Sequence, residues 1–274
     1  MPSNFKWGAG IAMHRLVKVC NAVRLHVALV YALIAITFVW AEGIRTQELV
    51  AVLCFTSLLS ASYLLNRITD VDSDRLSQPG EELEGNLVLF SVVLLAFVPL
   101  AFLVMFSLPV LPYITFIMVG AFYSLPAISG KSLREILILK NLYAAAAWYV
   151  SFALLESVYA GATSFLESLL SSPHVFALVL AYEIMWDIRD ADADRAAGIS
   201  TIPNTFGMVT TRLSLLTLFA WVLWMRDFDV SDPISVATVV LIPLSLLATP
   251  KTPRWVFHLT VYIMLAAVAV LVLW

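Results

Sequence analysis

The sequence predicts an all-α fold, a bundle of about nine transmembrane helices that forms one domain over residues 1–274. Of the 274 residues, 61% are hydrophobic and 13% are charged, whereas a soluble domain is typically about 45–50% apolar and about 25% charged. The apolar residues also form long runs, without the alternating polarity over ~10 residues that marks the strands of a membrane β-barrel. This composition excludes a soluble globular enzyme, a disordered chain and a nucleic-acid-binding protein with a basic face.

Nine apolar stretches approach the ~20 residues that cross a bilayer as a helix. They cover residues 25–41, 46–65, 87–106, 109–126, 141–160, 172–187, 208–225, 234–249 and 255–274. The first four stretches match the fifth to eighth at an offset of 120 residues, as Asp70 and Asp74 match Asp190 and Asp194. We therefore expect an internal repeat of residues 25–126 and 141–249, both halves in the same orientation, with a ninth helix at 255–274.

Lysine and arginine are distributed unequally between the two sides that nine helices would create. The chain has 16 such residues, and all except Arg45 and Arg226 fall on the side that holds the N-terminus. Because loops rich in lysine and arginine stay in the cytoplasm, we expect an integral, multi-pass membrane protein whose N-terminus is cytoplasmic.

Two clusters of aspartate stand at the cytoplasmic ends of the second and sixth expected helices. In each cluster three polar side chains have a spacing that places them on one helix face. The first set is Asn66, Asp70 and Asp74, and the second is Asp187, Asp190 and Asp194. Together with Asp72 and Asp192, the clusters hold seven aspartates, whose burial at membrane depth would cost about 20 kcal/mol at ~2.5–3.5 kcal/mol each. The carboxylates must therefore lie at the interface or line a wet cavity.

Two facing rows of carboxylates repel each other unless a cation lies between them. Mg²⁺ takes one or two carboxylates and completes its shell with water and substrate phosphate. The sequence therefore predicts a Mg²⁺ site and a phosphorylated ligand at the cytoplasmic face, with the active site on that side. The expected metal ligands are Asn66, Asp70, Asp74, Asp187, Asp190 and Asp194.

The two aspartate motifs resemble those of the UbiA superfamily of intramembrane prenyltransferases. The resemblance is carried by the Asn66–Asp74 pattern, by residues 187–203, by Tyr123-Ser-Leu-Pro before Lys131, and by Lys140-Asn141. It implies nine helices around a central cavity and Mg²⁺ that binds the diphosphate of an isoprenoid. The prenyl tail would lie in an apolar tunnel open to lipid. Ionisation of the allylic C–O bond would give a carbocation, which an acceptor, usually aromatic, would capture.

The candidate site residues follow from the motifs, the resemblance and the need for cations near a departing diphosphate. The catalytic candidates are Asp70, Asp74, Asp190, Asp194 and Lys140. The substrate-binding candidates are Asn66, Lys131, Tyr123, Asn141, Arg24 and Arg67. The sequence departs from the family pattern at Arg67, where an aspartate is usual, and in the loop 78–85, which holds three glutamates in place of a basic stretch.

The leading interpretation is a Mg²⁺-dependent prenyltransferase that uses a prenyl diphosphate donor and an unknown acceptor in the lipid bilayer, without nucleic acid. A terpene cyclase of the same superfamily is the alternative, because the acceptor region is atypical and a cyclase needs no acceptor. A cation transporter would place its acids near the bilayer midplane, whereas these lie at helix ends. A non-catalytic binding protein would follow if Arg67 disabled the site.

Overall fold

The computed structural model describes residues 24–39, 45–69, 85–125, 132–161 and 163–273. Every regular element within these ranges is helical, which confirms the all-α prediction. The long helices are α2 (Leu25–Val39), α3 (Thr46–Thr69), α5 (Gly85–Met105), α6 (Leu111–Ser124), α7 (Leu139–Leu154), α9 (Pro173–Ala196), α10 (Ile202–Met225), α11 (Pro233–Leu247) and α12 (Arg254–Leu273). A π-helical turn (Leu155–Ala160) extends α7, and the short α8 (Phe165–Ser171) precedes α9.

Each of the nine predicted apolar stretches coincides with one long helix. The main differences lie at the polar ends, because hydropathy does not detect a helical turn of charged residues. Helix α9 continues past the predicted end at 187 to Ala196, and α10 begins at Ile202 rather than at 208. The start of α10 is stabilised by a capping box in which the Asn204 side chain accepts a hydrogen bond from the backbone N–H of Thr201.

Helix length supports membrane spanning for most of these helices but not equally for all. Five described helices are long and apolar enough to cross a bilayer, and α8 with α9, bent by 63°, gives a sixth candidate. Helices α2, α6 and α11 are apolar but shorter, with 14 or 15 residues each. The prediction of an integral membrane protein thus agrees with the structure, whereas the count of nine spans remains a prediction.

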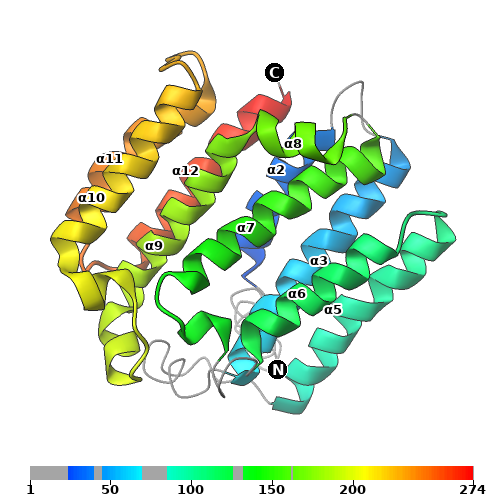
Figure 1. Ribbon diagram of the computed structural model, residues 1–274, viewed down its shortest axis with the longest axis horizontal. Helices are drawn as coiled ribbons and strands as arrows, with labels where there is room; N and C mark the ends of the chain where they lie inside the picture. The colour runs from blue at the N-terminus through cyan, green and yellow to red at the C-terminus, as the bar shows by residue number, and fades with distance from the viewer. Residues whose placement is uncertain (1–23, 40–44, 70–84, 126–131, 162, 274) are drawn as a thin grey trace, which may run out of the picture.

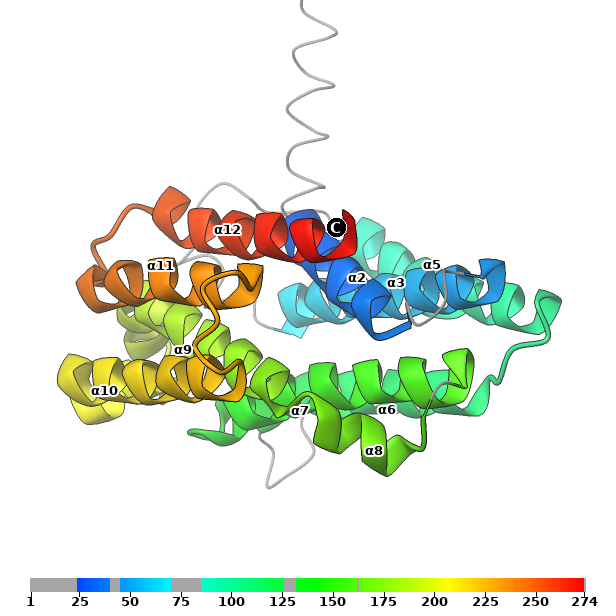
Figure 2. The same cartoon turned by 90° about the horizontal axis from the view of Figure 1, so that it is seen from above.

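The helices lie side by side in two rows that close on each other around an interior (Figures 1 and 2). Around this ring, α2 packs on α3, α3 on α5 and α6, α6 on α7, α7 on α9, and α9 on α10. Helices α11 and α12 complete the ring, because α12 packs on α2. The first and last described helices are therefore neighbours, and the aspartate-bearing helix α9 faces α7.

The outer surface of the bundle is strongly apolar. Helix α5 exposes Leu87, Phe90, Phe97 and Val104 at 52–65% of their surface. On a soluble monomer such a continuous apolar face would be unusual, whereas in a bilayer it contacts lipid tails. The buried side, by contrast, includes polar groups such as Asn141, Ser151 and Asp187, which is where the membrane helices direct their polar residues.

Candidate active site

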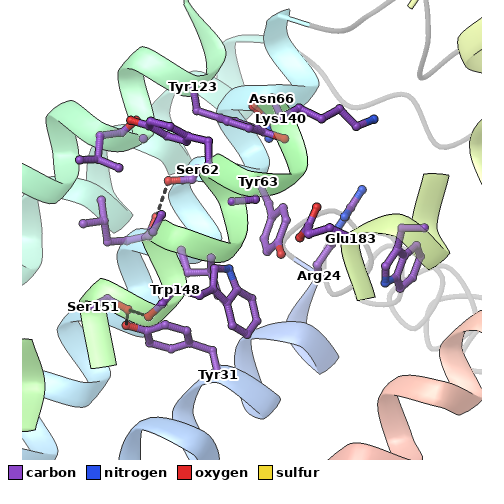
Figure 3. Close-up of a pocket in the computed structure, with 18 of the residues that line it drawn as sticks. Arg24, Tyr31, Ser62, Tyr63, Asn66, Tyr123, Lys140, Trp148, Ser151 and Glu183 are labelled. Carbon is purple, nitrogen blue, oxygen red and sulfur yellow. Dashed lines mark hydrogen bonds between the residues drawn. The ribbon is translucent and has the colours of Figure 1, made fainter. Parts of the chain in front are cut away.

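A cavity of about 230 Å³ lies inside the ring and is lined by α2, α3, α6, α7 and α9. One end is polar and includes Asn66, Lys140 and Asp194, while the other is formed by apolar and aromatic side chains such as Phe55 and Trp148. Figure 3 shows this sequence of side chains, with Asn66 and Lys140 at one end, Tyr63 and Glu183 between, and Tyr31 with Ser151 at the other. The cavity can therefore take a ligand with a charged head and an apolar tail.

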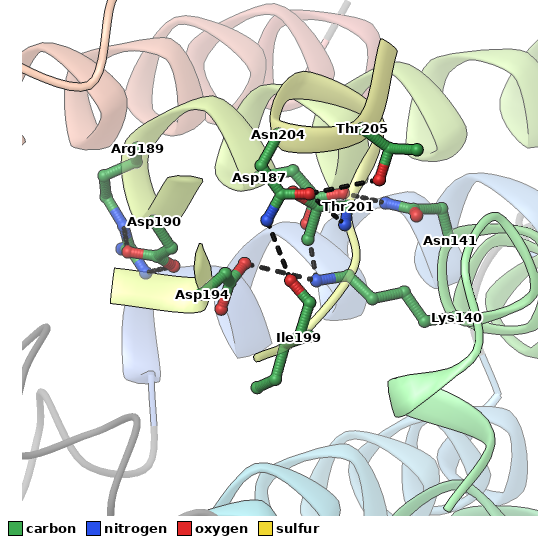
Figure 4. A network of polar contacts seen from close by, with 10 residues as sticks. All are labelled: Lys140, Asn141, Asp187, Arg189, Asp190, Asp194, Ile199, Thr201, Asn204 and Thr205. Atoms are coloured by element: carbon green, nitrogen blue, oxygen red, sulfur yellow. Dashed lines mark hydrogen bonds and ion pairs between the residues drawn. The ribbon is translucent and has the colours of Figure 1, made fainter. Parts of the chain in front are cut away.

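The polar end is organised by Lys140, in the first turn of α7 (Figure 4). Its ammonium nitrogen lies 2.7 Å from Oδ1 of Asp187 and 3.8 Å from Oδ2 of Asp194. Asn141 donates a hydrogen bond of 3.0 Å to Oδ2 of Asp187. Both oxygens of Asp187 thus have partners from α7, and the same lysine also approaches Asp194, about two turns further along α9.

Asp190, on the same helix, has a different partner. Its neighbour Arg189 donates to both carboxylate oxygens, and the Arg189 Nε–Oδ1 distance is 2.7 Å. The Arg189 guanidinium lies over the Trp186 ring, with 4.1 Å from Cζ to the ring centre. Arg24, at the start of α2, also lies over two rings, at 4.8 Å from Tyr63 and 5.6 Å from Trp186. Aromatic faces thus hold two guanidinium groups beside the carboxylates.

The sequence of α9 explains why its acids meet in the cavity. Glu183, Asp187, Asp190 and Asp194 are separated by four, three and four residues, so they follow one helix face. Asp192 is off this face and is exposed, as expected. The helix ends at Ala196, and Gly198 follows with φ +73°, so that the N–H of Ile199 donates to the Asp194 carbonyl at 2.8 Å. This cap turns the chain back over the polar end.

The structure brings together most of the predicted site residues that it describes. The cavity-lining members are Arg24, Asn66, Arg67, Tyr123, Lys140, Asp187, Asp190 and Asp194. Asn141 is buried and reaches the site through Asp187. Tyr123 stacks on Tyr143, with 5.8 Å between ring centres. Asp70, Asp74 and Lys131 lie outside the described residues, so their predicted roles remain predictions.

The cavity is also lined by residues outside the candidate site residues given above, and two of them, Tyr31 and Ser151, had no predicted role. Glu183 and Tyr63 line the middle of the cavity, and Tyr31 and Ser151 line its apolar end. A signal for them exists in the sequence, because Tyr63 with Glu183, and Tyr31 with Ser151, are each 120 residues apart. This separation equals the offset of the predicted repeat, which itself remains a prediction.

Whether these residues suit Mg²⁺ can be judged from their chemistry. Carboxylate oxygens are the donors that Mg²⁺ prefers, and Asp190 and Asp194 both face the cavity. In the part of the chain that the structure describes, no three His, Cys, Asp or Glu side chains are grouped as a complete metal site. The carboxylates of the second motif thus have the chemistry that a hard cation requires. Each of them also has a partner in this structure: Lys140 and Asn141 for Asp187, Arg189 for Asp190, and Lys140 for Asp194.

Comparison with known proteins adds a family and a fold. The sequence profile described as the UbiA prenyltransferase family matches residues 27–274. No curated protein sequence matches the chain. A solved structure of a UbiA homolog from Archaeoglobus fulgidus bound to GPP and Mg²⁺ is similar, with a TM-score of 0.66, 17% identity, and 92% of this chain and 98% of that chain covered.

Two further structures show the same arrangement. The Archaeoglobus fulgidus homolog bound to DMAPP and Mg²⁺ gives a TM-score of 0.65 at 17% identity, covering 92% of this chain and 98% of that one. The apo structure of a UbiA homolog from Aeropyrum pernix K1 gives 0.64 at 16% identity, covering 92% and 99%. At such identities the likeness concerns the fold, and it extends over nearly the whole of each chain.

Proposed function

Because the chain belongs to the UbiA prenyltransferase family, we propose that it is a Mg²⁺-dependent enzyme that transfers an isoprenoid chain from an allylic prenyl diphosphate to an acceptor within the membrane. The observation that carries this proposal is the cavity, whose carboxylate-rich and cationic end opens onto an apolar, aromatic interior. The similar structures from Archaeoglobus fulgidus hold Mg²⁺ together with DMAPP or GPP, which are ligands of this kind.

In the proposed complex, Asp190 and Asp194 of the second motif would hold Mg²⁺ together with Asn66, Asp70 and Asp74 of the first. Bound Mg²⁺ would neutralise the charge that develops on the departing diphosphate. This division of ligands follows the offset of 120 residues between the two motifs. It agrees with the finding that the described carboxylates alone do not form a complete metal site.

The chain's own cations would position the diphosphate and stabilise its departure. Lys140 lies between Asp187 and Asp194, and Arg67 and Arg24 line the same cavity. Lys140 is fixed by its contact with Asp187 and does not need to reorganise as negative charge builds up on the leaving oxygen. Preorganised charge of this kind is among the largest contributions to catalysis. Lys131, for which the structure gives no position, is proposed as a further cation.

The allylic carbon would lie deeper in the cavity, next to aromatic rings. Tyr63 and Trp148 line this part, and Trp186 lies beside Glu183 on α9. The faces of aromatic rings attract cations, so they would favour the positive charge that remains on the prenyl chain when the C–O bond breaks. An acceptor nucleophile would then form the new bond to this carbon.

The same aromatic lining favours a second candidate, a terpene cyclase. In a cyclase, the carbocation is captured by a double bond of the substrate itself, and the reaction ends with loss of a proton. The loop 78–85, with three glutamates, differs from the basic stretch typical of the transferases. Both candidates share the first step, the Mg²⁺-dependent release of diphosphate, and differ in the product.

A product assay without added acceptor tests the first step and separates the two candidates. The chain is purified in detergent and mixed with Mg²⁺ and farnesyl or geranylgeranyl diphosphate, and both diphosphate and hydrocarbons are measured. We expect diphosphate release that a chelator stops and that Asp190→Ala reduces at least ten-fold, whereas the exposed Asp192→Ala retains it. A cyclic hydrocarbon would identify a cyclase.

The absence of a hydrocarbon would favour the transferase, and a panel of aromatic and lipid acceptors would follow. Diphosphate release that is equal in Asp190→Ala and the unmodified protein would contradict the assignment of the second motif to the metal. No consumption of any prenyl diphosphate, either in this assay or with the acceptor panel, would contradict the proposed function itself.

A further inference from the structure

Four aromatic side chains pack together at the apolar end of the cavity. Tyr31 on α2 contacts Trp148 and Phe152 on α7, with 5.2 Å and 4.9 Å between ring centres. Phe152 stacks in turn on Phe38, at 5.3 Å and an interplanar angle of 16°. Tyr31 and Phe152 are almost fully buried. These four rings, called here the aromatic floor, join α2 to α7, and two of them, Tyr31 and Trp148, line the cavity.

Hydrogen bonds fix the Tyr31 ring of this floor. The Tyr31 hydroxyl donates to Oγ of Ser151 over 2.7 Å, and the Ser151 hydroxyl donates to the Trp148 carbonyl over 2.6 Å. Inside a membrane bundle a polar group that loses its partner is costly. The Tyr31 ring is therefore held across the end of the cavity, whereas an alkyl side chain, which has no hydrogen bond to hold it, would move aside more easily.

We propose that Tyr31, held by Ser151, is the stop against which the end of the isoprenoid chain rests, and that it sets the length of the prenyl diphosphate the protein accepts. This inference rests on the proposed function, because it assumes that the diphosphate lies at the Lys140 end. Figure 3 shows Tyr31, Trp148 and Ser151 together at the end of the cavity opposite Lys140 and Asn66.

The distance along α7 gives an expected chain length. Lys140 and Ser151 are 11 residues apart on this helix, which corresponds to about 16 Å at 1.5 Å per residue. An extended chain of single bonds advances about 1.2 Å per bond, so an isoprene unit, with four main-chain bonds, spans about 5 Å. The cavity therefore has room for about three units, a chain of fifteen carbons.

Residues on α2 and α7 allow the proposed stop to be moved away from Lys140 or toward it. Tyr31→Ala removes the ring and lengthens the space toward Phe38. Ala147 lines the cavity one helical turn above Ser151, so Ala147→Phe places a new ring above the floor. Each change has a matched control: Tyr31→Phe keeps the ring and removes only the hydroxyl, and Ala146→Phe adds the same ring at a neighbouring position outside the cavity lining.

The experiment measures dissociation constants, in detergent with Mg²⁺, for thiolodiphosphate analogues with five, ten, fifteen and twenty carbons. These analogues do not ionise readily, so the measurement reports binding. For the unmodified protein we expect affinity to rise up to fifteen carbons and to fall about ten-fold at twenty. Tyr31→Ala shifts this limit to twenty carbons, Ala147→Phe shifts it to ten, and both controls leave it at fifteen.

Two outcomes would overturn the inference while leaving the proposed function standing. The first is binding in the unmodified protein that stays level or increases through twenty carbons, which would mean that the tail passes between helices into lipid. The second is an unchanged length limit in both Tyr31→Ala and Ala147→Phe. If Tyr31→Ala fails to fold, the opposite shift by Ala147→Phe decides alone. Failure of the unmodified protein to bind any analogue would instead contradict the proposed function.

Discussion

Lys140 combines a structural and a chemical role in one ammonium group. Its contact with Asp187 joins the start of α7 to α9, and both side chains are largely buried, at 15% and 5% exposure. A buried ion pair contributes little net stability compared with an apolar pair, but removal of one partner leaves an unpaired charge in a medium of low polarity. The site therefore depends on the pair being complete.

We expect Lys140→Met to lower the free energy of unfolding by about 3–5 kcal/mol, because Asp187 then carries an uncompensated buried charge. The double variant Lys140→Met/Asp187→Asn should recover most of this stability and should still release no diphosphate. Unfolding in detergent and diphosphate release measure the two properties separately. Lys251→Met, at an exposed lysine between α11 and α12, is the control, and equal stability of the two lysine variants would contradict the structural role.

Asp232, in the loop between α10 and α11, supplies a pH-dependent contribution to stability. Burial opposes its ionisation, but hydrogen bonds from Arg226 and Ser235 outweigh this effect and lower the pKa of the carboxyl from 3.8 to about 2. Arg226 Nε lies 3.1 Å from Oδ2, and the Ser235 backbone N–H donates over 2.8 Å. Since the folded-state pKa is depressed, the stabilisation is complete above pH 4 and is lost as the pH falls toward 2.

Asp232→Asn should therefore be less stable than the unmodified protein by about 2 kcal/mol above pH 4. This difference should shrink steadily between pH 4 and pH 2, as the native carboxylate becomes protonated. Denaturant titration in detergent at several pH values measures it. Asp227→Asn, at an exposed position of the same loop, controls for the general effect of charge, and a difference that is constant with pH would contradict the assignment.

Individual residues of the site were predictable from the sequence where chemistry restricts them strongly. Aspartates in an apolar chain are costly at membrane depth, so Asp190 and Asp194 were expected at a cavity. The partnership of Asp187 with Lys140 and Asn141 was not predicted, because the sequence gives no information on which helix faces α9. The role of Tyr31 was not predicted for a similar reason, because the sequence does not show whether one tyrosine among apolar neighbours contacts lipid or the interior of the bundle.

At the level of elements, the contact of α3 with α6 requires a glycine. A Cβ added at Gly120 would lie 2.7 Å from Oγ of Ser62 and 3.7 Å from its Cβ. The Ser62 hydroxyl donates to the Leu58 carbonyl over 3.1 Å. Both Gly120 and Ser62 line the cavity, so this close approach determines the width of its wall.

Gly120→Ala should destabilise the protein by about 1 kcal/mol, because either the Ser62 hydroxyl must turn away or α6 must shift outward. Ser62→Ala removes the atom that clashes and leaves an ordinary contact, so Gly120→Ala/Ser62→Ala should be close to Ser62→Ala in stability. Thermal unfolding in detergent measures the three variants. Gly85→Ala, where a Cβ meets nothing within 4 Å, is the control. A loss in the double variant as large as in Gly120→Ala would disprove the proposed clash.

Hydropathy predicted the existence of the helices but not their polar ends, which for α9 only the spacing of the aspartates indicated. Membrane helices satisfy their own backbone hydrogen bonds, so long apolar runs identify them with little dependence on context. Asp190 and Asp194 lie within α9, beyond the apolar run that ends at 187. Here helical structure continues because Lys140 and the Gly198 cap stabilise the last turns, and both depend on groups outside the apolar run.

On the scale of the whole molecule, the predicted duplication and the cavity support each other. Tyr31 donates a hydrogen bond to Ser151 at the apolar end of the cavity, and these residues are 120 positions apart. Tyr63 and Glu183, with the same separation, also line it. Two halves in the same orientation would meet at an axis along the membrane normal, and residues at equivalent positions approach each other only near such an axis. We propose that the cavity lies on this axis, which explains why one metal site would draw on both motifs.

The predicted side of each loop depends most strongly on whether the short helices α2, α6 and α11 cross the membrane. Helix α11 has 15 residues, about 22 Å in length, compared with about 30 Å for the hydrocarbon core of a bilayer. If α11 nevertheless crosses, Val230 before it and Lys251 after it lie on opposite sides, and the charge distribution assigns Lys251 to the cytoplasm. Both side chains are exposed and therefore suit labelling.

We expect Val230→Cys to react with a membrane-impermeant maleimide only from outside the cell, and Lys251→Cys only in inside-out vesicles. Both are made in a protein whose native Cys20 and Cys54 are replaced by alanine, and this cysteine-free protein is the control for background labelling. Labelling of both positions from one side would show that α11 does not cross the membrane. The prediction of an even number of spans in the second repeat, residues 141–249, would then be wrong. Reversed accessibility would instead keep nine spans and place the aspartate clusters outside the cytoplasm. The prediction of a cytoplasmic active site requires that Val230→Cys is labelled from outside and Lys251→Cys from inside. Under that prediction one face of the membrane holds the diphosphate end of the cavity, the loop after α11 and most of the lysine and arginine residues.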